Sequence, residues 1–369
     1  MAGALKMGFI GAGQVAREIH LPLLSQMPQV EPLVLCDVHE AALDGAFRKF
    51  GIRETTTRYQ DVLKMTEVDA VLIAVPNYLH ARIAEEALRA GKHVLCEKPS
   101  ALTVRDAMAV KQAAEASGAV YMMALPHRFD AEAALLKRWI GAGHLGRIFH
   151  VRAGAMRRDA CPGGWFTDRE RSGGGALMQV GSNLLDLLLW LLDFPEVGRV
   201  SASISNHLAP ARAGEPTRSL AMPRARGLVY DVEDAAFCML RLNGHASVVL
   251  EVAWSLHCDA DRDYLEIYGD RAGAALWPLR LFQDMDGVHV DVSPHPQTPP
   301  AYPALARHFV ECVLASERGQ AVSPRGNAQD GLRLTHLLHH LYLSAEAERE
   351  VDVVDAAALT PPRKGESIA

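Results

Sequence analysis

Short apolar runs alternate with amphipathic stretches over the first third of this 369-residue chain. We expect the apolar runs to be strands, at Met7–Ile10, Pro32–Cys36, Ala70–Val75, His93–Cys96 and Val120–Ala124. The stretches between them space their apolar residues three and four apart, which predicts helices at Gln14–Ser25, Glu40–Phe50, Leu79–Ala90 and Val104–Ser117. Continuously apolar strands joined by helices are typical of a parallel sheet covered on both faces. The pattern therefore predicts a doubly wound α/β domain.

The pattern changes after about residue 125. Alternating segments that predict strands follow one another, with turn residues between several of them, at Arg199–Asn206, Asp234–Leu242, Ala246–Trp254, Asp263–Tyr268, Ala274–Pro278 and Val288–Val292. Helices are predicted around them, at Ala131–Ile140, Asn183–Leu192, Ala304–Ser316 and Asn327–Glu346. We therefore divide the chain into a first domain over 1–124, a second α/β domain over 125–350 and a tail over 351–369. Residues 209–227, rich in Ala, Pro, Gly and Arg, are predicted to form a long surface loop.

Charge and hydropathy exclude several classes of partner. The net charge is −6, and no long run of one sign occurs, which argues against nucleic acid or an anionic membrane surface as a partner. The longest apolar stretch, 184–192, is interrupted by Asp186 and has about half the length of a membrane span.

The cysteines and the N-terminus favour a cytoplasmic location. The six cysteines lie far apart without a Cys-x-x-Cys pair, and most have apolar neighbours, so we interpret them as buried thiols. Residues 1–7 lead directly into a predicted strand rather than into a signal sequence. His336 and His340 have a spacing that metal ligands can use, but no Glu or Cys partner is evident, so no metal site is predicted.

A glycine-rich turn follows the first predicted strand and opens the first helix. Its residues are Gly11-Ala12-Gly13-Gln14-Val15-Ala16. The first glycine allows a tight turn, the second lets the backbone approach a pyrophosphate, and the small third residue, Ala16, allows close helix–strand packing. The N–H groups at the helix N-terminus can then bind phosphate oxygens. Asp37 ends the second strand about two dozen residues later, where a carboxylate binds the adenosine ribose hydroxyls. It would repel a 2′-phosphate, so the sequence predicts NAD in preference to NADP.

Two more motifs lie at the ends of predicted parallel strands, where α/β sheets bind ligands. One is Val75-Pro76-Asn77 with His80, and the other is Glu97-Lys98-Pro99. Proline restricts the residue before it to extended geometry, so Lys98 is held stiffly. A partly desolvated lysine there can shuttle a proton or polarise a carbonyl oxygen during hydride transfer. On the tripeptide alone, a solvated lysine in a turn remains the alternative.

These motifs occur in one order along the chain, together with Ala90-Gly91-Lys92-His93-Val94 and Ser172-Gly173-Gly174-Gly175-Ala176-Leu177. In combination they resemble the glucose–fructose oxidoreductase, inositol dehydrogenase and rhizopine catabolism (Gfo/Idh/MocA) family. The resemblance implies a Rossmann domain, and a C-terminal α/β domain with an open, mostly antiparallel sheet whose face pairs subunits into homodimers or homotetramers. It also implies an active site between the domains, with Lys98 as the lysine of the Glu-Lys-Pro motif, and bound NAD near Val75, Pro76, Asn77, His80 and Glu97.

The chain departs from this family at two positions. Members that act on sugars and cyclitols usually carry an Asp and a catalytic His where this chain has Gln179 and Asn183. These residues are four apart, so we expect them to share one helix face. Amides can bind substrate hydroxyls but do not titrate near neutral pH, so neither can be a general base. Asp186 is interpreted as a helix-surface or dimer-contact carboxylate.

Two explanations of the departure stay open. In one, Lys98 alone manages the proton, with Gln179 and Asn183 orienting the substrate, and the protein interconverts a secondary alcohol and a ketone on a carbohydrate or cyclitol. In the other, dehydrogenase chemistry has been lost or redirected toward an NAD-assisted epimerase, lyase or hydrolase, or toward sensing. We favour the first because the cofactor motifs are intact. Candidate substrate contacts in the second domain are Arg157, Trp165 and His257.

Overall fold

The computed structural model describes residues 4–208, 229–244, 246–296 and 300–359, so the predicted loop at 209–227 lies outside the described residues. The chain divides into two compact units. The first contains Met1–Leu102, Asp106–Asp130 and Thr298–Arg333, and the second contains Thr103–Arg105, Ala131–Gln297 and Leu334–Ala369. The sequence-based division ends the first domain at residue 124, whereas the segment Thr298–Arg333 also belongs to the first unit.

The first unit contains a six-stranded sheet in the order β3-β2-β1-β4-β5-β6. All its ladders are parallel, which confirms the predicted doubly wound sheet. The strands are β1 (Leu5–Ile10), β2 (Val30–Cys36), β3 (Glu54–Thr56), β4 (Ala70–Ile73), β5 (His93–Cys96) and β6 (Tyr121–Met123). Every residue of β4 is buried, as expected for a strand with helices on both faces. The short edge strand β3 is missing from the sequence-based prediction.

The helices of this unit follow the predicted pattern with two interruptions, and the helix at Tyr59–Lys64 is missing from the sequence-based prediction. They are η1 (Ala16–His20), α1 (Leu21–Ser25), α2 (Glu40–Leu43), α3 (Ala46–Phe50), α4 (Tyr59–Lys64), η2 (Asn77–Leu79), α5 (His80–Arg89), α6 (Val104–Ser117), η3 (Pro126–Phe129) and α11 (Ala301–Glu317). The predicted helix 14–25 contains a wide π turn, η1, which ends two residues before Pro22, a residue that lacks the N–H of a regular helix. The predicted helix 40–50 breaks at Gly45, where φ is +76°.

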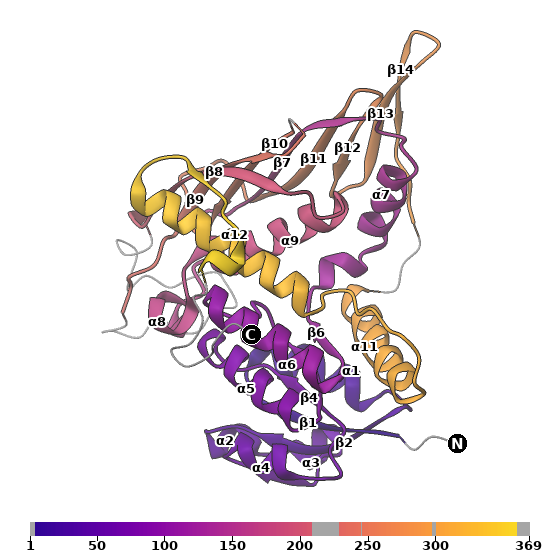
Figure 1. The fold of residues 1–369 in the computed structure, drawn as a ribbon, viewed down its shortest axis with the longest axis vertical. Coiled ribbons are helices and arrows are strands. Elements are labelled where there is room, and N and C mark those ends of the chain that lie inside the picture. Colours follow the sequence, from indigo (N-terminus) through magenta and orange to yellow (C-terminus); the bar gives the residue numbers. More distant parts are fainter. Residues whose placement is uncertain (1–3, 209–228, 245, 297–299, 360–369) are drawn as a thin grey trace, which may run out of the picture. The chain divides into compact units, whose positions relative to one another are not determined.

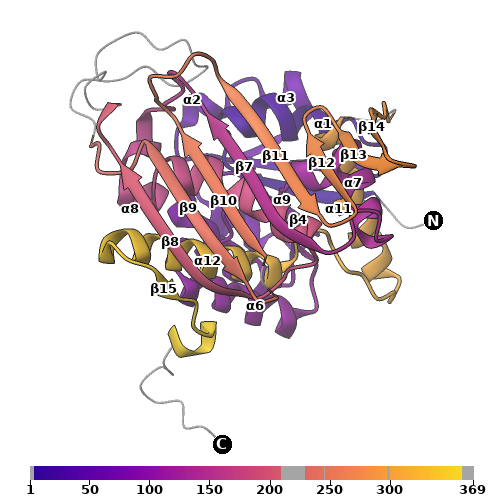
Figure 2. The ribbon, with the colours of Figure 1, turned by 90° about the horizontal axis from the view of Figure 1, so that it is seen from above.

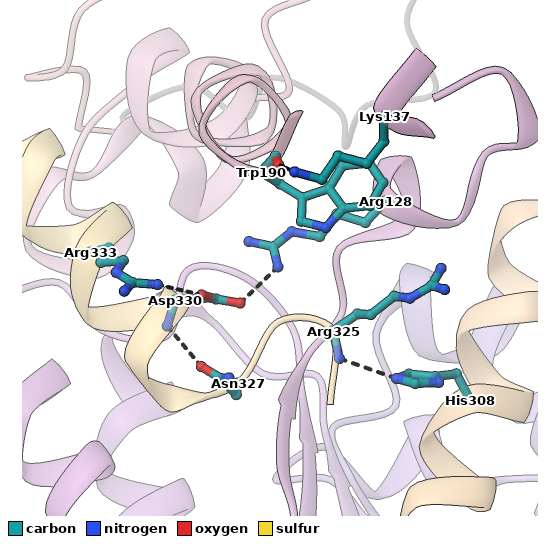
Figure 3. A network of polar contacts seen from close by, with 8 residues as sticks. All are labelled: Arg128, Lys137, Trp190, His308, Arg325, Asn327, Asp330 and Arg333. Atoms are coloured by element: carbon teal, nitrogen blue, oxygen red, sulfur yellow. Dashed lines mark hydrogen bonds and ion pairs between the residues drawn. The ribbon is translucent and has the colours of Figure 1, made fainter. Parts of the chain in front are cut away.

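Buried polar contacts hold the segment around α11 in the first unit (Figure 3). Arg128, only 1% exposed, donates from Nη1 to Asp330 Oδ2 at 2.7 Å. The backbone N–H of Asp330 donates to Asn327 Oδ1, and that of Arg325 donates to His308 Nε2. Burying an arginine and an aspartate without partners would be costly, so their pairing ties the segment to the turn that follows β6.

The second unit contains a nine-stranded sheet in the order β14-β13-β12-β11-β7-β10-β9-β8-β15. Only the pair β7·β10 is parallel, which confirms the mostly antiparallel sheet. The strands are β7 (Ile148–Met156), β8 (Val197–Ser205), β9 (Ala235–Leu242), β10 (Ser247–Ala253), β11 (Arg262–Gly269), β12 (Ala272–Leu276), β13 (Arg280–Met285), β14 (Val288–Val292) and β15 (Val351–Asp352). Strands β7, β13 and β15 are absent from the prediction, and β15 lies at the start of the segment assigned as a tail.

Helices pack on one face of this sheet, as Figures 1 and 2 show for α7 (Ala131–Gly141), α9 (Ser182–Leu191) and α12 (Ala328–Ala347). Alternate residues of β10, namely Val248, Leu250 and Val252, are fully buried on that side. The remaining short elements are η4 (Gly164–Thr167), α8 (Arg169–Ser172), η5 (Leu177–Gly181) and η6 (Ala356–Leu359). Over the described ranges, no helix is both long and apolar enough to cross a membrane.

Candidate active site

The strand register gathers the predicted cofactor residues at one edge of the first sheet. Ile10 pairs with Cys36 and with Ile73, and Ile73 pairs with Cys96. The residues that follow these strands, Gly11, Asp37, Ala74 and Glu97, are therefore aligned at the carboxyl ends. This is the edge where open α/β sheets bind their ligands.

The turn after β1 requires glycine at its first position. Gly11 has φ of +100°, and a Cβ there would lie 2.2 Å from the Ala74 carbonyl oxygen. At Gly13 an added Cβ would meet no atom within 4 Å, so the backbone at this position faces open space. Ala16 is fully buried, which explains why the third position must be small. The turn thus offers an open approach to the helix N-terminus beside Gln14 and Val15, as a pyrophosphate requires.

Asp37 joins the end of β2 to this turn. One of its oxygens, Oδ2, accepts a hydrogen bond from the Ala12 backbone N–H at 2.8 Å, and Oδ1 accepts one from the His39 N–H at 2.9 Å. Both bonds use backbone donors, so the carboxylate is held in place beside the turn. Asp37 is half-buried, which leaves part of it exposed for a ribose hydroxyl.

The Val75–His80 motif forms the connection from β4 to α5. Pro76 precedes the short helix η2, and Asn77 is buried at 8% exposure. His80 is only 1% exposed, and its ring nitrogens lie 2.8 Å from two main-chain oxygens, those of Val75 and Pro99. Its ring is therefore engaged within the protein, while Val75 and Pro76 remain half-buried at the edge of the sheet.

Glu97 contacts a histidine that the sequence did not single out. Glu97 Oε1 lies 2.7 Å from His20 Nε2, and Oε2 accepts the Lys98 backbone N–H at 3.3 Å. The His20 hydrogen bond and charge help to lower the pKa of Glu97 against the opposing effect of burial. Tyr302 of α11 packs edge-on against the His20 ring, with the centroids 5.8 Å apart. A buried pair thus fixes the residue that precedes Lys98.

Lys98 has the altered acidity that proton transfer needs. Burial lowers the pKa of its amine to about 8, and the negative charge of Glu97 opposes that shift. The side chain is half-buried, and the Lys98–Pro99 peptide is cis. A general acid or base works best when its pKa lies near the working pH, so Lys98 suits that role.

Gln179 and Asn183 lie in the second unit, at the π turn η5 and in α9. The Asn183 side-chain amide donates to the Gln179 carbonyl oxygen at 3.3 Å, so the two residues share one helix face as predicted. Gln179 Oε1 accepts a hydrogen bond from Trp254 Nε1 at 2.8 Å. Because an indole N–H can only donate, this contact decides which atom of the Gln179 amide is the oxygen. Asp186 is 2% exposed, so its interpretation as a helix-surface carboxylate is wrong.

A buried carboxylate supports the glycine run before Gln179. Glu233 Oε1 accepts the backbone N–H groups of Gly175 and Leu177, both at 2.9 Å, and the Tyr342 hydroxyl at 2.9 Å. A Cβ at Gly175 would lie 1.8 Å from the Glu233 carbonyl oxygen, so only glycine fits there. Desolvation raises the pKa of Glu233. This acceptor binds N–H groups that a helix start leaves unpaired.

Comparison with known proteins identifies the family. Residues 5–125 match the family model described as "Oxidoreductase family, NAD-binding Rossmann fold", and residues 133–275 match the "GFO/IDH/MocA C-terminal domain". The putative UDP-kanosamine synthase oxidoreductase subunit of Amycolatopsis mediterranei is 33% identical over 74% of this chain and 75% of its own length. The chain belongs to the Gfo/Idh/MocA oxidoreductase family.

Two further similarities extend over nearly the whole chain. D-glucoside 3-dehydrogenase of Escherichia coli is 29% identical over 95% of this chain and 97% of its own length. A structure of levoglucosan dehydrogenase, in complex with NADH and L-sorbose, superposes with a TM-score of 0.82 at 24% identity. It covers 96% of this chain and all of that one, and it shows that the fold is shared. As a Gfo/Idh/MocA member, the protein is an NAD-dependent oxidoreductase.

The first unit fits the cofactor of this family. Gly11 closes the turn and Gly13 leaves its approach open. The backbone anchors Asp37 beside them. These residues would hold the pyrophosphate and the adenosine ribose of NAD.

The three residues predicted to contact substrate lie in the second unit, where two of them contact other side chains and the third is exposed to solvent. The Arg157 guanidinium contacts both carboxylate oxygens of Asp263, at 2.6 and 2.8 Å. Trp165 stacks on Phe166 with ring centroids 3.9 Å apart. His257 is exposed and follows the end of β10. Their assignment to substrate stays a prediction, with Arg157 already serving to join β7 to β11.

Within the described ranges, no group of three or more His, Cys, Asp or Glu side chains is placed to hold a metal ion. His340 Nδ1 lies 2.9 Å from the His336 carbonyl oxygen, and its Nε2 accepts the Val354 N–H at 3.2 Å. The His340 ring is therefore engaged within the helix and with the chain that follows it, whereas His336 contributes only its main-chain carbonyl oxygen to these contacts.

Sequence reasoning missed three residues that contact candidate site residues within their own unit, His20 in the first unit and Glu233 and Trp254 in the second. His20 lies on the buried stripe Ala16–His20–Leu24, and a histidine on such a stripe needs a polar partner. Trp254 continues the inward alternation of β10, and its indole likewise needs an acceptor. For Glu233 the sequence around it gives no comparable signal.

Proposed function

We propose that this protein interconverts a secondary alcohol and a ketone on a sugar, a sugar derivative or a cyclitol. The sugar class rests on the names of its relatives, among them D-glucoside 3-dehydrogenase, levoglucosan dehydrogenase and inositol 2-dehydrogenase. The observation that carries the proposal is the position and acidity of the Lys98 amine. Its amine has a pKa lowered to about 8, and it follows β5 at the ligand-binding edge of an NAD-binding sheet.

Lys98 manages the proton of this reaction. Bound NAD(H) would supply the hydride in reduction and accept it in oxidation. In reduction the Lys98 ammonium donates its proton to the ketone oxygen, and solvent then reprotonates the amine. In oxidation the neutral amine accepts the hydroxyl proton. Gln179 and Asn183 bind and orient neighbouring hydroxyls, because their amides donate and accept hydrogen bonds without titrating.

The test is the absorbance of NADH with a panel of glucosides, levoglucosan, inositols and their keto forms. We expect turnover with at least one of them, and a loss of about 100-fold in kcat for Lys98→Met. The exposed residue Lys49 of α3 offers a control, since Lys49→Met removes a charge from the same unit. Unchanged turnover in Lys98→Met would reject the role of Lys98.

The amides at 179 and 183 favour a second candidate, an NAD-assisted epimerase, lyase or hydrolase without net redox change. Neither Gln179 nor Asn183 can act as the base that the usual His supplies, so the chemistry could be redirected. Product would then form without accumulation of NADH. Chromatography of the products alongside the absorbance assay separates the two candidates. A sensor without activity would give neither product nor NADH.

We also propose that the open face of the nine-stranded sheet, the face opposite the helices α7, α9 and α12, joins subunits into a homodimer or homotetramer. Phe237 and Met239 of β9 are 40% and 39% exposed on that face.

The cytoplasmic location predicted from cysteine usage stays a prediction. None of the six cysteines, all within the described ranges, forms a disulfide, and five of them are buried while Cys258 is half-buried.

A further inference from the structure

The buried His80 ring joins the two loops that the proposed reaction uses. Its Nε2 lies 2.8 Å from the carbonyl oxygen of Val75, directly before Pro76. Its Nδ1 lies 2.8 Å from the carbonyl oxygen of Pro99, directly after Lys98. One loop follows β4 and the other follows β5, which are neighbours in the sheet. A single side chain therefore spans both loops.

The contacts of His80 leave no ring nitrogen for a ligand. With 1% exposure, the ring is enclosed by protein on all sides. Carbonyl oxygens only accept hydrogen bonds, so the imidazolium form satisfies both, while the neutral ring, which has a single N–H, can donate to only one of them. Burial lowers the pKa of His80, and the two carbonyl oxygens and the Glu97 carboxylate oppose that shift.

The other side of Lys98 is fixed as well, because Glu97 bonds to His20. Lys98 thus lies between two anchored neighbours, the Glu97 side chain and the Pro99 carbonyl group. We propose that His80, which the sequence had assigned to cofactor binding, is a positioning residue that sets the spacing between the Val75–Pro76 backbone and the Lys98 amine. This inference rests on the proposed function of Lys98.

Loss of the two His80 contacts, with the carbonyl oxygens of Val75 and Pro99, should move the Lys98 amine rather than abolish the binding of NAD or sugar. A displacement of about 1 Å at a reacting group can cost about 100-fold in rate. In His80→Phe we therefore expect kcat to fall by about 30- to 100-fold, with the KM values for NAD and sugar within about threefold of wild type. His80→Asn and His80→Gln each retain one donor, toward Pro99 and Val75 respectively, and should give intermediate values. These two variants also keep the test valid if His80→Phe does not fold.

The chain provides a matched control at the other end of β5. Lys92, 8% exposed, donates from Nζ to the carbonyl oxygens of Met65 at 2.8 Å and Val68 at 2.7 Å. Lys92→Met thus also removes one buried side chain that bridges two carbonyl groups. We expect it to lower the melting temperature as the His80 variants do, but to leave kcat within about twofold of wild type.

A second readout does not depend on turnover. The pH dependence of Lys98 acetylation by acetic anhydride, followed by mass spectrometry, reports the pKa of its amine. We expect a midpoint near 8 in wild type and in Lys92→Met, and a rise toward the ordinary value of 10.5 in His80→Phe as water reaches the amine. Equal midpoints, or equal kcat values, in His80→Phe and Lys92→Met would overturn the inference. If the wild type turns over no sugar but the acetylation midpoint still shifts in His80→Phe, the positioning role of His80 is supported and the proposed function is rejected.

Discussion

Two opposing effects act on the Lys98 amine. Burial lowers its pKa, and the Glu97 carboxylate raises it, with a net value of about 8. Glu97 itself stays ionised because its pKa is lowered, in part by the hydrogen bond to His20. The working pH range of the proposed proton donor therefore depends on the charge of the residue that precedes it in the chain.

Removing that charge should move the pH profile. In Glu97→Gln the amine loses the influence that raises its pKa, so the pKa falls below about 8. Because reduction needs the ammonium form, its rate is lost as the pH rises through this pKa, and the loss should begin at lower pH in the variant. The measurement is kcat/KM for ketone reduction against pH. Glu115→Gln on α6, an exposed change, should leave the profile unmoved. A profile displaced to higher pH in Glu97→Gln would contradict this account.

Variants at the two glycines of the first turn should affect different properties, stability at Gly11 and NAD binding at Gly13. A Cβ at Gly11 would collide with the Ala74 carbonyl oxygen, whereas one at Gly13 would meet nothing within 4 Å. We expect Gly11→Ala to cost about 2 kcal/mol or more in the free energy of unfolding. Gly13→Ala should keep wild-type stability but weaken NAD binding by about tenfold or more, since the methyl group would occupy the approach of the pyrophosphate. Urea unfolding and calorimetric titration with NAD measure the two effects, and equal NAD affinity in Gly13→Ala and wild type would refute the assignment.

At the scale of elements, the start of η5 and α9 depends on one carboxylate. Glu233 accepts two backbone N–H groups and one hydroxyl with a single oxygen. Its removal would leave these buried donors without an acceptor, which is costlier than the loss of an ordinary hydrogen bond.

Variants at Glu233 should therefore differ by chemistry rather than by size alone. Glu233→Ala should cost about 3 kcal/mol of unfolding free energy, because the Gly175 and Leu177 N–H groups lose their acceptor. Glu233→Gln keeps an oxygen acceptor and should cost about 1 kcal/mol or less. Tyr342→Phe, which removes one donor, is expected to lie near 1 kcal/mol. Urea denaturation gives all three values, and a Glu233→Gln variant as unstable as Glu233→Ala would disprove the acceptor role.

Elements with a strong local pattern were predictable, and those shaped by distant contacts were not. The apolar run His93–Cys96 was predicted with its observed bounds because it is buried on both faces. The central strand β7 was missed because small residues such as Gly154 give it little strand character. Gly154 is small because a Cβ there would lie 2.4 Å from the Tyr264 ring of β11, a partner more than a hundred residues away in sequence.

The same distinction holds for the site. The glycine turn and Asp37 form a local motif whose role the sequence reveals. The contact of Glu97 with His20 spans 77 residues, and that of Gln179 with Trp254 spans 75. Nothing in the local pattern selects such partners, so the sequence located the proposed proton donor but not the groups that hold it in place.

At the scale of the whole molecule, the open face of the nine-stranded sheet has the exposed apolar residues expected of a subunit interface. Along β9, Cys238 and Leu240 are buried while Phe237 and Met239 alternate with them on the open face. Polar groups lie beside these apolar ones: Arg152 stacks on Tyr264 and pairs with Glu266 at 3.4 Å. A broad face that mixes aromatic, aliphatic and paired charged groups is typical of subunit interfaces.

We expect this face to hold the proposed homodimer or homotetramer together. Phe237→Lys and Met239→Glu place charges where an apolar contact would be buried, so each should raise the dissociation constant at least tenfold. Light scattering after size-exclusion chromatography should then show the mass of a single chain instead of two or four. Phe47→Lys is the matched control, because Phe47 is 60% exposed but lies on α3 of the first unit. A wild-type protein that is already a single chain, or a Phe47→Lys variant that dissociates equally, would exclude the sheet face as the interface.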